Sequence, residues 1–192
     1  MVIIVVFWFF WYAIHSLLAS LCVKRFIMAR IPQIFPYYRL VYNMVALLTL
    51  IPVLYIHARQ PDVIVFTASR WLTFGGYLLI GLGIVLLIVA MRSYDFREFL
   101  GFAEMNEFRR RPSPLSTSGL NSRMRHPLYT ASLIVITGYL LTSLTLNTIG
   151  FAVISIGYIV IGSELEERKL IKRYNEQYRA YQKRVRRFFP FP

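Results

Sequence analysis

The chain has 192 residues, of which 57% are hydrophobic, and it carries a net charge of +13 and a mean hydropathy of +0.52. This composition is more apolar than that of a typical soluble domain and therefore argues against a soluble protein. A single cysteine, Cys22, excludes an intramolecular disulfide, and three histidines in separate segments lead us to expect no metal site.

Four apolar blocks follow one another along the chain, at residues 2–23, 41–56, 72–91 and 128–162. A bilayer core is spanned by roughly 20 apolar residues. The fourth block is long enough to cross and return, with a polar turn near 143–148 and two short arms. The blocks therefore predict an all-α, polytopic membrane protein with about five transmembrane helices.

The basic residues have an uneven distribution along this predicted topology. With five spans, every lysine and arginine except Arg59 and Arg70 falls on one side of the membrane. Lysine and arginine gather on the cytoplasmic side of membrane proteins. We therefore expect an external N-terminus and a cytoplasmic C-terminus, and the net charge is explained without a nucleic-acid partner.

Polar and small residues inside the apolar blocks are candidates for contacts between helices. His15 lies in the first block, where an ionisable side chain is costly and usually faces the protein interior. It is either a neutral histidine bonded to a neighbouring helix, for instance to Asn43, or a polar point in an acceptor pocket. In the third block, small residues predict close helix packing: Gly75, Gly76, Gly81 and Gly83.

The C-terminal region, 163–185, has a strongly helical composition. Its apolar and aromatic residues recur at helical spacing: Leu170, Tyr174, Tyr178, Tyr181 and Val185. This stripe predicts one amphipathic cytoplasmic helix whose other face is basic and suits anionic membrane lipids or the cytoplasmic loops. We expect one membrane domain, 1–192, with three spans in 1–91 and a loop, a hairpin and the C-terminal helix in 92–192.

Two charged clusters bracket the predicted hairpin. RMRHPLY stands at its entry and ELEE at its exit, and a helical hairpin brings its two ends together. These side chains should therefore lie close to one another: Arg125, His126, Tyr129, Glu164, Glu166 and Glu167. Acids beside bases and aromatic hydroxyls can bind a zwitterionic ligand. They can equally form a salt-bridged collar around the hairpin.

The series LSTSGLNSRMRHPLY, EERKL and YxxYxxRV resembles the isoprenylcysteine carboxyl methyltransferase family, whose relatives include phospholipid N-methyltransferases. The resemblance covers about 115–190. The N-terminal stretches AIHSLLAS and YYRLVYN look more like the bacterial branch of this superfamily. That branch includes thiol methyltransferase-like proteins and accessories of nitrite and nitric oxide reduction. The resemblance thus implies a prokaryotic plasma membrane protein.

The resemblance also implies S-adenosylmethionine as methyl donor, with S-adenosylhomocysteine as product. The positions that match the family's cofactor-binding residues are Ser113, Leu115, Ser116, Asn121, His126, Pro127, Leu128, Tyr129, Glu166 and Glu167. At Asn121 the family has a tyrosine. Proton acceptors for a thiol or an ammonium acceptor are expected among His126, Glu164, His15 and Tyr129.

One departure from the family concerns the methyl acceptor. Prenylcysteine enzymes place an arginine for the substrate carboxylate at the position of Gly162, and glycine cannot pair with a carboxylate. We therefore expect another small or lipophilic acceptor, a thiol, an amine or a different carboxylate. The alternatives are a non-catalytic accessory protein on the same scaffold and a lipid-binding structural protein whose charges are interfacial anchors.

Overall fold

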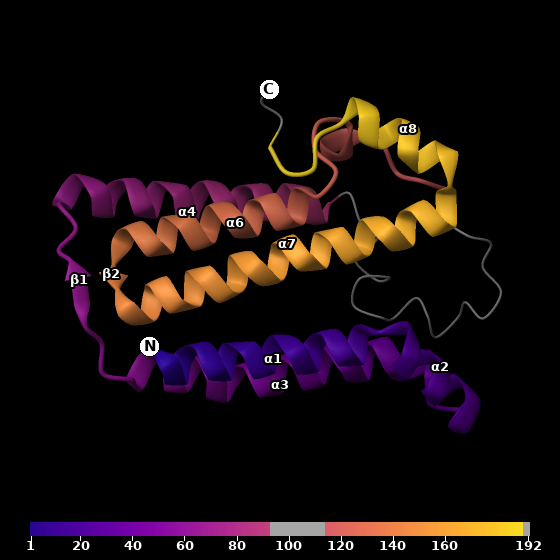
Figure 1. Cartoon of the computed structure of the whole chain (residues 1–192), viewed down its shortest axis with the longest axis horizontal. Coiled ribbons are helices and arrows are strands. Elements are labelled where there is room, and N and C mark those ends of the chain that lie inside the picture. Colours follow the sequence, from indigo (N-terminus) through magenta and orange to yellow (C-terminus); the bar gives the residue numbers. More distant parts are fainter. Residues whose placement is uncertain (93–113, 190–192) are drawn as a thin grey trace. The chain divides into compact units, whose positions relative to one another are not determined.

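The computed structural model describes residues 1–92 and 114–189, which form two compact units (Figure 1). The described part of the first unit is 1–62, and that of the second is 63–92 and 114–189. The architecture is all-α, as predicted. Among the described residues, the helices long and apolar enough to cross a membrane lie in Val2–Ala19, Phe35–Arg59, Arg70–Met91 and Leu146–Tyr174. The shorter apolar helix Pro127–Thr142 corresponds to the fourth expected span, the first arm of the hairpin.

In the first unit, α1 (Val2–Ala19) runs alongside α3 (Tyr38–Arg59) (Figure 1). The first apolar block is not one helix, because Ser20 is extended and its hydroxyl accepts a hydrogen bond from the amide of Val23. This cap ends α1 and begins α2 (Leu21–Arg30), so the expected single span over 2–23 was wrong at its C-terminal end. A 3-10 turn, η1 (Phe35–Tyr37), leads into α3.

In the second unit, α4 (Arg70–Met91), α6 (Pro127–Thr142) and α7 (Leu146–Tyr174) lie side by side (Figure 1). A 3-10 turn, η3 (Gly119–Ser122), precedes α6. The predicted polar turn joins α6 to α7, and Thr145 and Thr148 form a reciprocal capping box at the start of α7. The sequence pattern does not predict the short antiparallel pair of strands, β1 (Ile64–Phe66) and β2 (Leu144–Thr145).

The two arms of the hairpin differ in length. With 16 residues, α6 is short as expected, whereas α7 continues beyond the apolar block to a total of 29 residues. The second arm was therefore predicted too short. The cluster ELEE stands inside a continuous helix, so its side chains take fixed positions around the axis of α7.

The C-terminal region is two helices rather than the one predicted. α7 ends at Tyr174, and α8 (Glu176–Arg184) begins after Asn175, which has a φ of 48°. Asparagine adopts a positive φ more readily than most other residues. The break lets α8 turn back with Tyr178 and Tyr181 buried, so these members of the predicted stripe do face the interior.

The closest helix contact in the second unit is between α4 and α6. A Cβ added at Gly76 would lie 2.7 Å from the carbonyl oxygen of Gly138, and one at Gly83 would lie 2.6 Å from Cγ2 of Val135. Close packing is thereby confirmed for Gly76 and Gly83. Within 1–92 and 114–189 it is not found at Gly75 and Gly81, where an added Cβ would meet no atom within 4 Å.

Replacing Gly76 with alanine is expected to lower the free energy of unfolding by about 1–3 kcal/mol, because the new methyl group would overlap the backbone of α6. Gly75→Ala is the matched control, since Gly75 lies next to Gly76 in the same helix, a Cβ added there would meet no described atom within 4 Å, and alanine is the better helix former. Denaturation in detergent, followed by tryptophan fluorescence, measures both variants. Equal stability of the two would contradict the close contact.

Candidate functional site

The start of α6 and the acidic stretch of α7 lie together, as the hairpin predicted. Arg125 and His126 stand at the N-terminus of α6 and contact glutamates near the C-terminal end of α7. Every residue of this cluster belongs to the second unit. The cluster is therefore built by one hairpin and by the segments that pack over its charged end.

Glu167 is the centre of the cluster and is only 2% exposed. Arg125 donates to Oε1 through Nε and Nη2, both at 2.8 Å, and Nε2 of His126 lies 3.1 Å from the same oxygen. Gln182 and Arg187 donate to Oε2 at 2.9 and 3.0 Å. Because both oxygens are occupied, this carboxylate holds the cluster together and has little capacity left for a ligand.

The contact with Glu167 defines the orientation of the His126 ring. A carboxylate only accepts, so Nε2 carries a proton and Nδ1 is left with its lone pair in the neutral ring. Nδ1 is directed to the side of Glu166, with 3.8 Å between Nδ1 and Oε2. The ring is buried and stacks on Tyr129 at a centroid distance of 5.4 Å.

Glu166 differs from its neighbour Glu167 in exposure. Its side chain is 47% exposed, and His126 is its one ionic neighbour among the described residues. Gly162 lies one turn earlier on α7, and a Cβ added there would be 4.0 Å from the hydroxyl of Tyr129. His126, Tyr129, Gly162 and Glu166 thus lie together across α6 and α7, with Glu166 as the exposed member, and we call this group the His126–Glu166 face.

Glu164, a predicted proton acceptor, is engaged in ion pairs. Nη2 of Arg187 lies 2.6 Å from its Oε2, and Nε of Arg168 lies 3.5 Å from its Oε1. Burial alone would lower the pKa of Arg187, but its bonds to Glu164 and Glu167 raise that pKa overall. The hydrogen bond and charge of Arg187 lower the pKa of Glu164, which makes Glu164 a poor proton acceptor.

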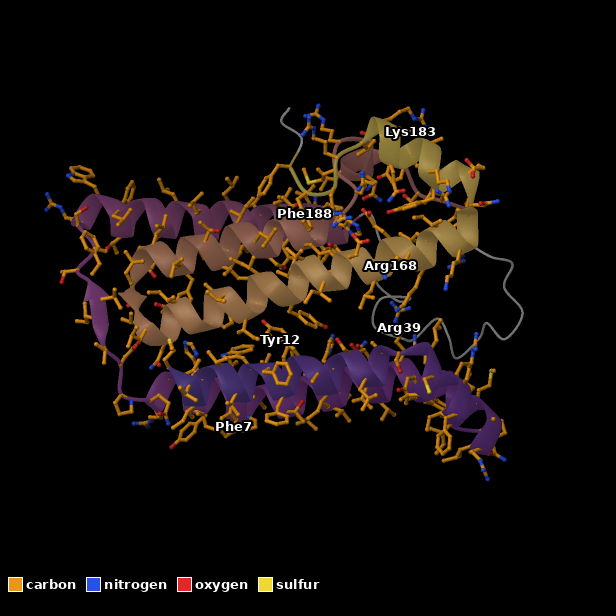
Figure 2. All side chains as sticks on the ribbon, viewed as in Figure 1. Phe7, Tyr12, Arg39, Arg168, Lys183 and Phe188 are labelled. Carbon is orange, nitrogen blue, oxygen red and sulfur yellow. The ribbon has the colours of Figure 1, made fainter. Side chains whose placement is uncertain are left out.

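A C-terminal strap, residues 185–188, crosses the start of α6. Carbonyl groups of Arg186 and Arg187 accept the amides of Arg125 and His126 at 2.8 and 3.0 Å. The carbonyl of Phe188 accepts the hydroxyl of Thr130 at 2.7 Å, beside the first turn of α6 (Figure 2). The strap therefore accepts hydrogen bonds from backbone amides at the start of α6 and places Arg187 beside Glu164 and Glu167. The sequence pattern does not predict the strap, because main-chain pairing between residues far apart in the chain depends on no particular side chain.

The other predicted cofactor residues lie in the loop before α6 and in its first turn. Asn121 is buried, its amide nitrogen is 3.4 Å from the carbonyl oxygen of Ser116, and its backbone oxygen accepts the hydroxyl of Tyr181. Leu115 is partly buried and Ser116 is exposed. Pro127 and Leu128 begin α6 directly after His126. Ser113 lies outside the described residues.

Two buried polar atoms of this region have no hydrogen-bond partner among the described residues, Oδ1 of Asn121 and the hydroxyl of Tyr178. Burial raises the pKa of Tyr178, and the nearby Glu167 adds to this rise. The phenol therefore keeps its proton and stays a potential donor. Unsatisfied buried groups of this kind are rare in folded proteins and mark places where a ligand or water can bind.

His15 belongs to the first unit. The hydroxyl of Tyr42 lies 2.7 Å from its Nε2, and its ring stacks on Trp11 at 5.3 Å. The interpretation of a histidine bonded to a neighbouring helix is supported, with Tyr42, the residue before Asn43, as a partner. Its role as a proton acceptor stays a prediction.

Comparison with known proteins gives matches to membrane methyltransferases. The phospholipid methyltransferase family matches residues 71–177, which is more than half of the chain. The chain is 30% identical over 130 residues, or 66% of its length, to a methanethiol S-methyltransferase of Pseudomonas deceptionensis. It is 32% identical over 115 residues, or 58% of its length, to a protein of the same name from another Pseudomonas strain.

A third methanethiol S-methyltransferase, from Crocosphaera subtropica, is 26% identical over 119 residues, which are 60% of this chain. The matched segments are 45%, 43% and 46% of the three relatives, so the chain spans under half of their length. No solved structure matches the chain. The family match includes α4, α6, α7 and the start of α8, and with them the whole His126–Glu166 face. The chain is therefore an integral membrane protein of the phospholipid methyltransferase family, as its motifs suggested.

Proposed function

We propose that the chain is an S-adenosylmethionine-dependent methyltransferase that acts on a small thiol. The observation that carries this proposal is the His126–Glu166 face, where an accessible carboxylate and an imidazole acceptor nitrogen lie together at the end of the hairpin. The family match and the names of the three relatives support the reaction class and the thiol.

The residues present fit a cofactor that carries an ammonium group and ribose hydroxyls. Glu166 has an accessible carboxylate that can accept from such donors. Gly162 leaves open space beside the hydroxyl of Tyr129. Oδ1 of Asn121 and the Tyr178 hydroxyl add unused polar atoms nearby in the same unit. Leu115, Ser116, Pro127 and Leu128 complete the proposed site, as in the related family, and Glu167 takes the structural role.

When bound, the cofactor supplies a methyl carbon that is activated by a sulfonium charge. The chain has to provide a thiolate and hold it close to that carbon. Nδ1 of His126 would accept the thiol proton, so the electron pair of the S–H bond stays on the acceptor sulfur and leaves it as a thiolate. Glu167 stabilises the imidazolium that results, since it already accepts the proton on Nε2. Positioning of the two reactants in a dry pocket supplies the remaining acceleration.

The acceptor and the orientation of the protein follow from charge. No arginine stands at Gly162, which favours a neutral thiol over a carboxylate. The basic residues of the loops and of α8 favour the cytoplasm for this side of the membrane, and hence for the entry of the cofactor. The resemblance to the bacterial branch supports the plasma membrane of a prokaryote.

Glu166→Gln is expected to weaken binding of S-adenosylhomocysteine by about 10–100-fold, because a charge-assisted hydrogen bond contributes about 1.5–3 kcal/mol. Glu176→Gln is the matched control, since Glu176 is 81% exposed on α8 and its ionic partner is Arg179. Calorimetric titration of the purified protein in detergent measures both variants, and transfer of labelled methyl groups to methanethiol measures activity.

Equal affinity of wild type and Glu166→Gln would remove Glu166 from the cofactor site. Tight binding of S-adenosylhomocysteine without methyl transfer to thiols, amines or lipids would indicate a non-catalytic accessory protein on the same scaffold instead of an enzyme. Absence of binding in a folded wild-type protein would exclude both.

A further inference from the structure

A hollow beside the strap is formed mainly by residues that follow Tyr181. It is an open cavity of about 610 Å³ between the end of α8 and the start of α6. Figure 2 shows Lys183 on α8 and Phe188 on the segment that follows. The residues that line this basic hollow are Arg125, Gln182, Lys183, Arg184, Val185, Arg186, Arg187, Phe188 and Phe189.

The hollow has a strong positive charge. Five of its nine lining residues are basic and none is acidic. Arg125 and Arg187 are neutralised by Glu167 and Glu164. In contrast, the exposed side chains of Lys183, Arg184 and Arg186 pair with no carboxylate among the described residues. A concave surface lined by one sign of charge concentrates counter-ions, so this hollow attracts an anion.

The level of the hollow relative to the membrane favours a lipid anion over a soluble one. α6 has 16 residues, or roughly 24 Å of helix, whereas a bilayer core is about 30 Å thick. A span this short has its first turn at the boundary between hydrocarbon and headgroups. The strap is bonded to that first turn and therefore lies at the level of the headgroups. Phe188 packs against the hairpin and the His126 ring, whereas the apolar side chain of Phe189 is exposed and suited to the same boundary.

From these observations we infer that the basic hollow binds the phosphate of an anionic phospholipid. Lys183, Arg184 and Arg186 supply the charge, and the exposed Phe189 contacts the start of the acyl chains. A lipid in this place contacts the strap that carries Arg187, so its binding stabilises the contacts of Glu167. The inference concerns lipid binding alone and does not depend on methyl transfer.

The test replaces Lys183, Arg184 and Arg186 with glutamine in the full-length protein. The control variant replaces Lys169, Lys172 and Arg179 with glutamine. These substitutions remove the same charge from exposed positions outside the hollow. Native mass spectrometry measures retention of phosphatidylglycerol and of phosphatidylcholine by both variants. Each basic residue near an anionic surface contributes about 1 kcal/mol, so the hollow variant should retain phosphatidylglycerol at least tenfold less well than the control.

The lipid pair separates headgroup charge from general lipid affinity. Wild type should retain phosphatidylglycerol over phosphatidylcholine, and the control should keep this preference. An equal loss in the two triple variants would show that surface charge in general, and not the hollow, binds the lipid. Displacement of phosphatidylglycerol by millimolar inorganic phosphate would identify a soluble-anion site and overturn the lipid assignment.

Discussion

Glu167→Gln is expected to lower the free energy of unfolding by about 3 kcal/mol or more, the largest effect on stability of any single change in the cluster. Its carboxylate accepts from Arg125, His126, Gln182 and Arg187 in a site where its side chain is 3% exposed. Removal of one partner from a buried ion pair typically costs 3–5 kcal/mol, because the remaining charge keeps its desolvation penalty without compensation. The amide keeps the shape of the side chain, so the loss reports the charge.

The neighbouring glutamate provides the contrast that tests this assignment. Glu166→Gln changes the same side chain one position earlier, where it is 47% exposed, and should leave stability nearly unchanged while it weakens cofactor binding. Titration with a denaturing detergent, followed by the fluorescence of the three tryptophans, compares both variants with wild type. The opposite order of stability would show that the roles of the two glutamates are exchanged.

The hairpin was predictable because it follows from length and pattern. One apolar block too long for a single span, with charges at both ends, requires those ends to meet, and they do at His126 and Glu167. The sequence alone does not separate Glu166 from Glu167. Their difference depends on the angle of each side chain around α7 and on which partners lie opposite. Gln182 and Arg187 come from segments that follow α7, so burial of Glu167 depends on the return of the chain.

After α7 the chain turns back towards the start of α6, and the sequence pattern does not predict this turn for a physical reason. A composition rich in helix formers predicts one helix through Asn175, and the positive φ of this single residue ends the helix instead. Once α8 turns back, Tyr178 and Tyr181 pack inside and residues 185–188 reach the start of α6. The strap is held mainly by backbone carbonyl groups, which every residue has. The pattern of side chains therefore does not predict the position of the strap.

His126→Asn is expected to reduce methyl transfer to a thiol by about 10²–10⁴-fold near neutral pH, since this is the usual contribution of a positioned base. The affinity for S-adenosylhomocysteine should fall much less, because the proposed contact of the cofactor is with Glu166. The diagnostic measurement is the rate as a function of pH. A thiol ionises without help as the pH approaches its own pKa, so the variant should regain activity relative to wild type at alkaline pH.

A purely structural role of His126 would give a different pattern. Loss of the bond to Glu167 would then weaken the fold and the cofactor site together, and the deficit would be the same at every pH. The two patterns are distinguished by the ratio of wild-type to variant rates, measured with saturating cofactor and folded protein across the alkaline range. A constant ratio would remove the proton acceptor from the proposed mechanism. Nδ1 would then serve only to orient the thiol, which would have to lose its proton to water before it reached the site.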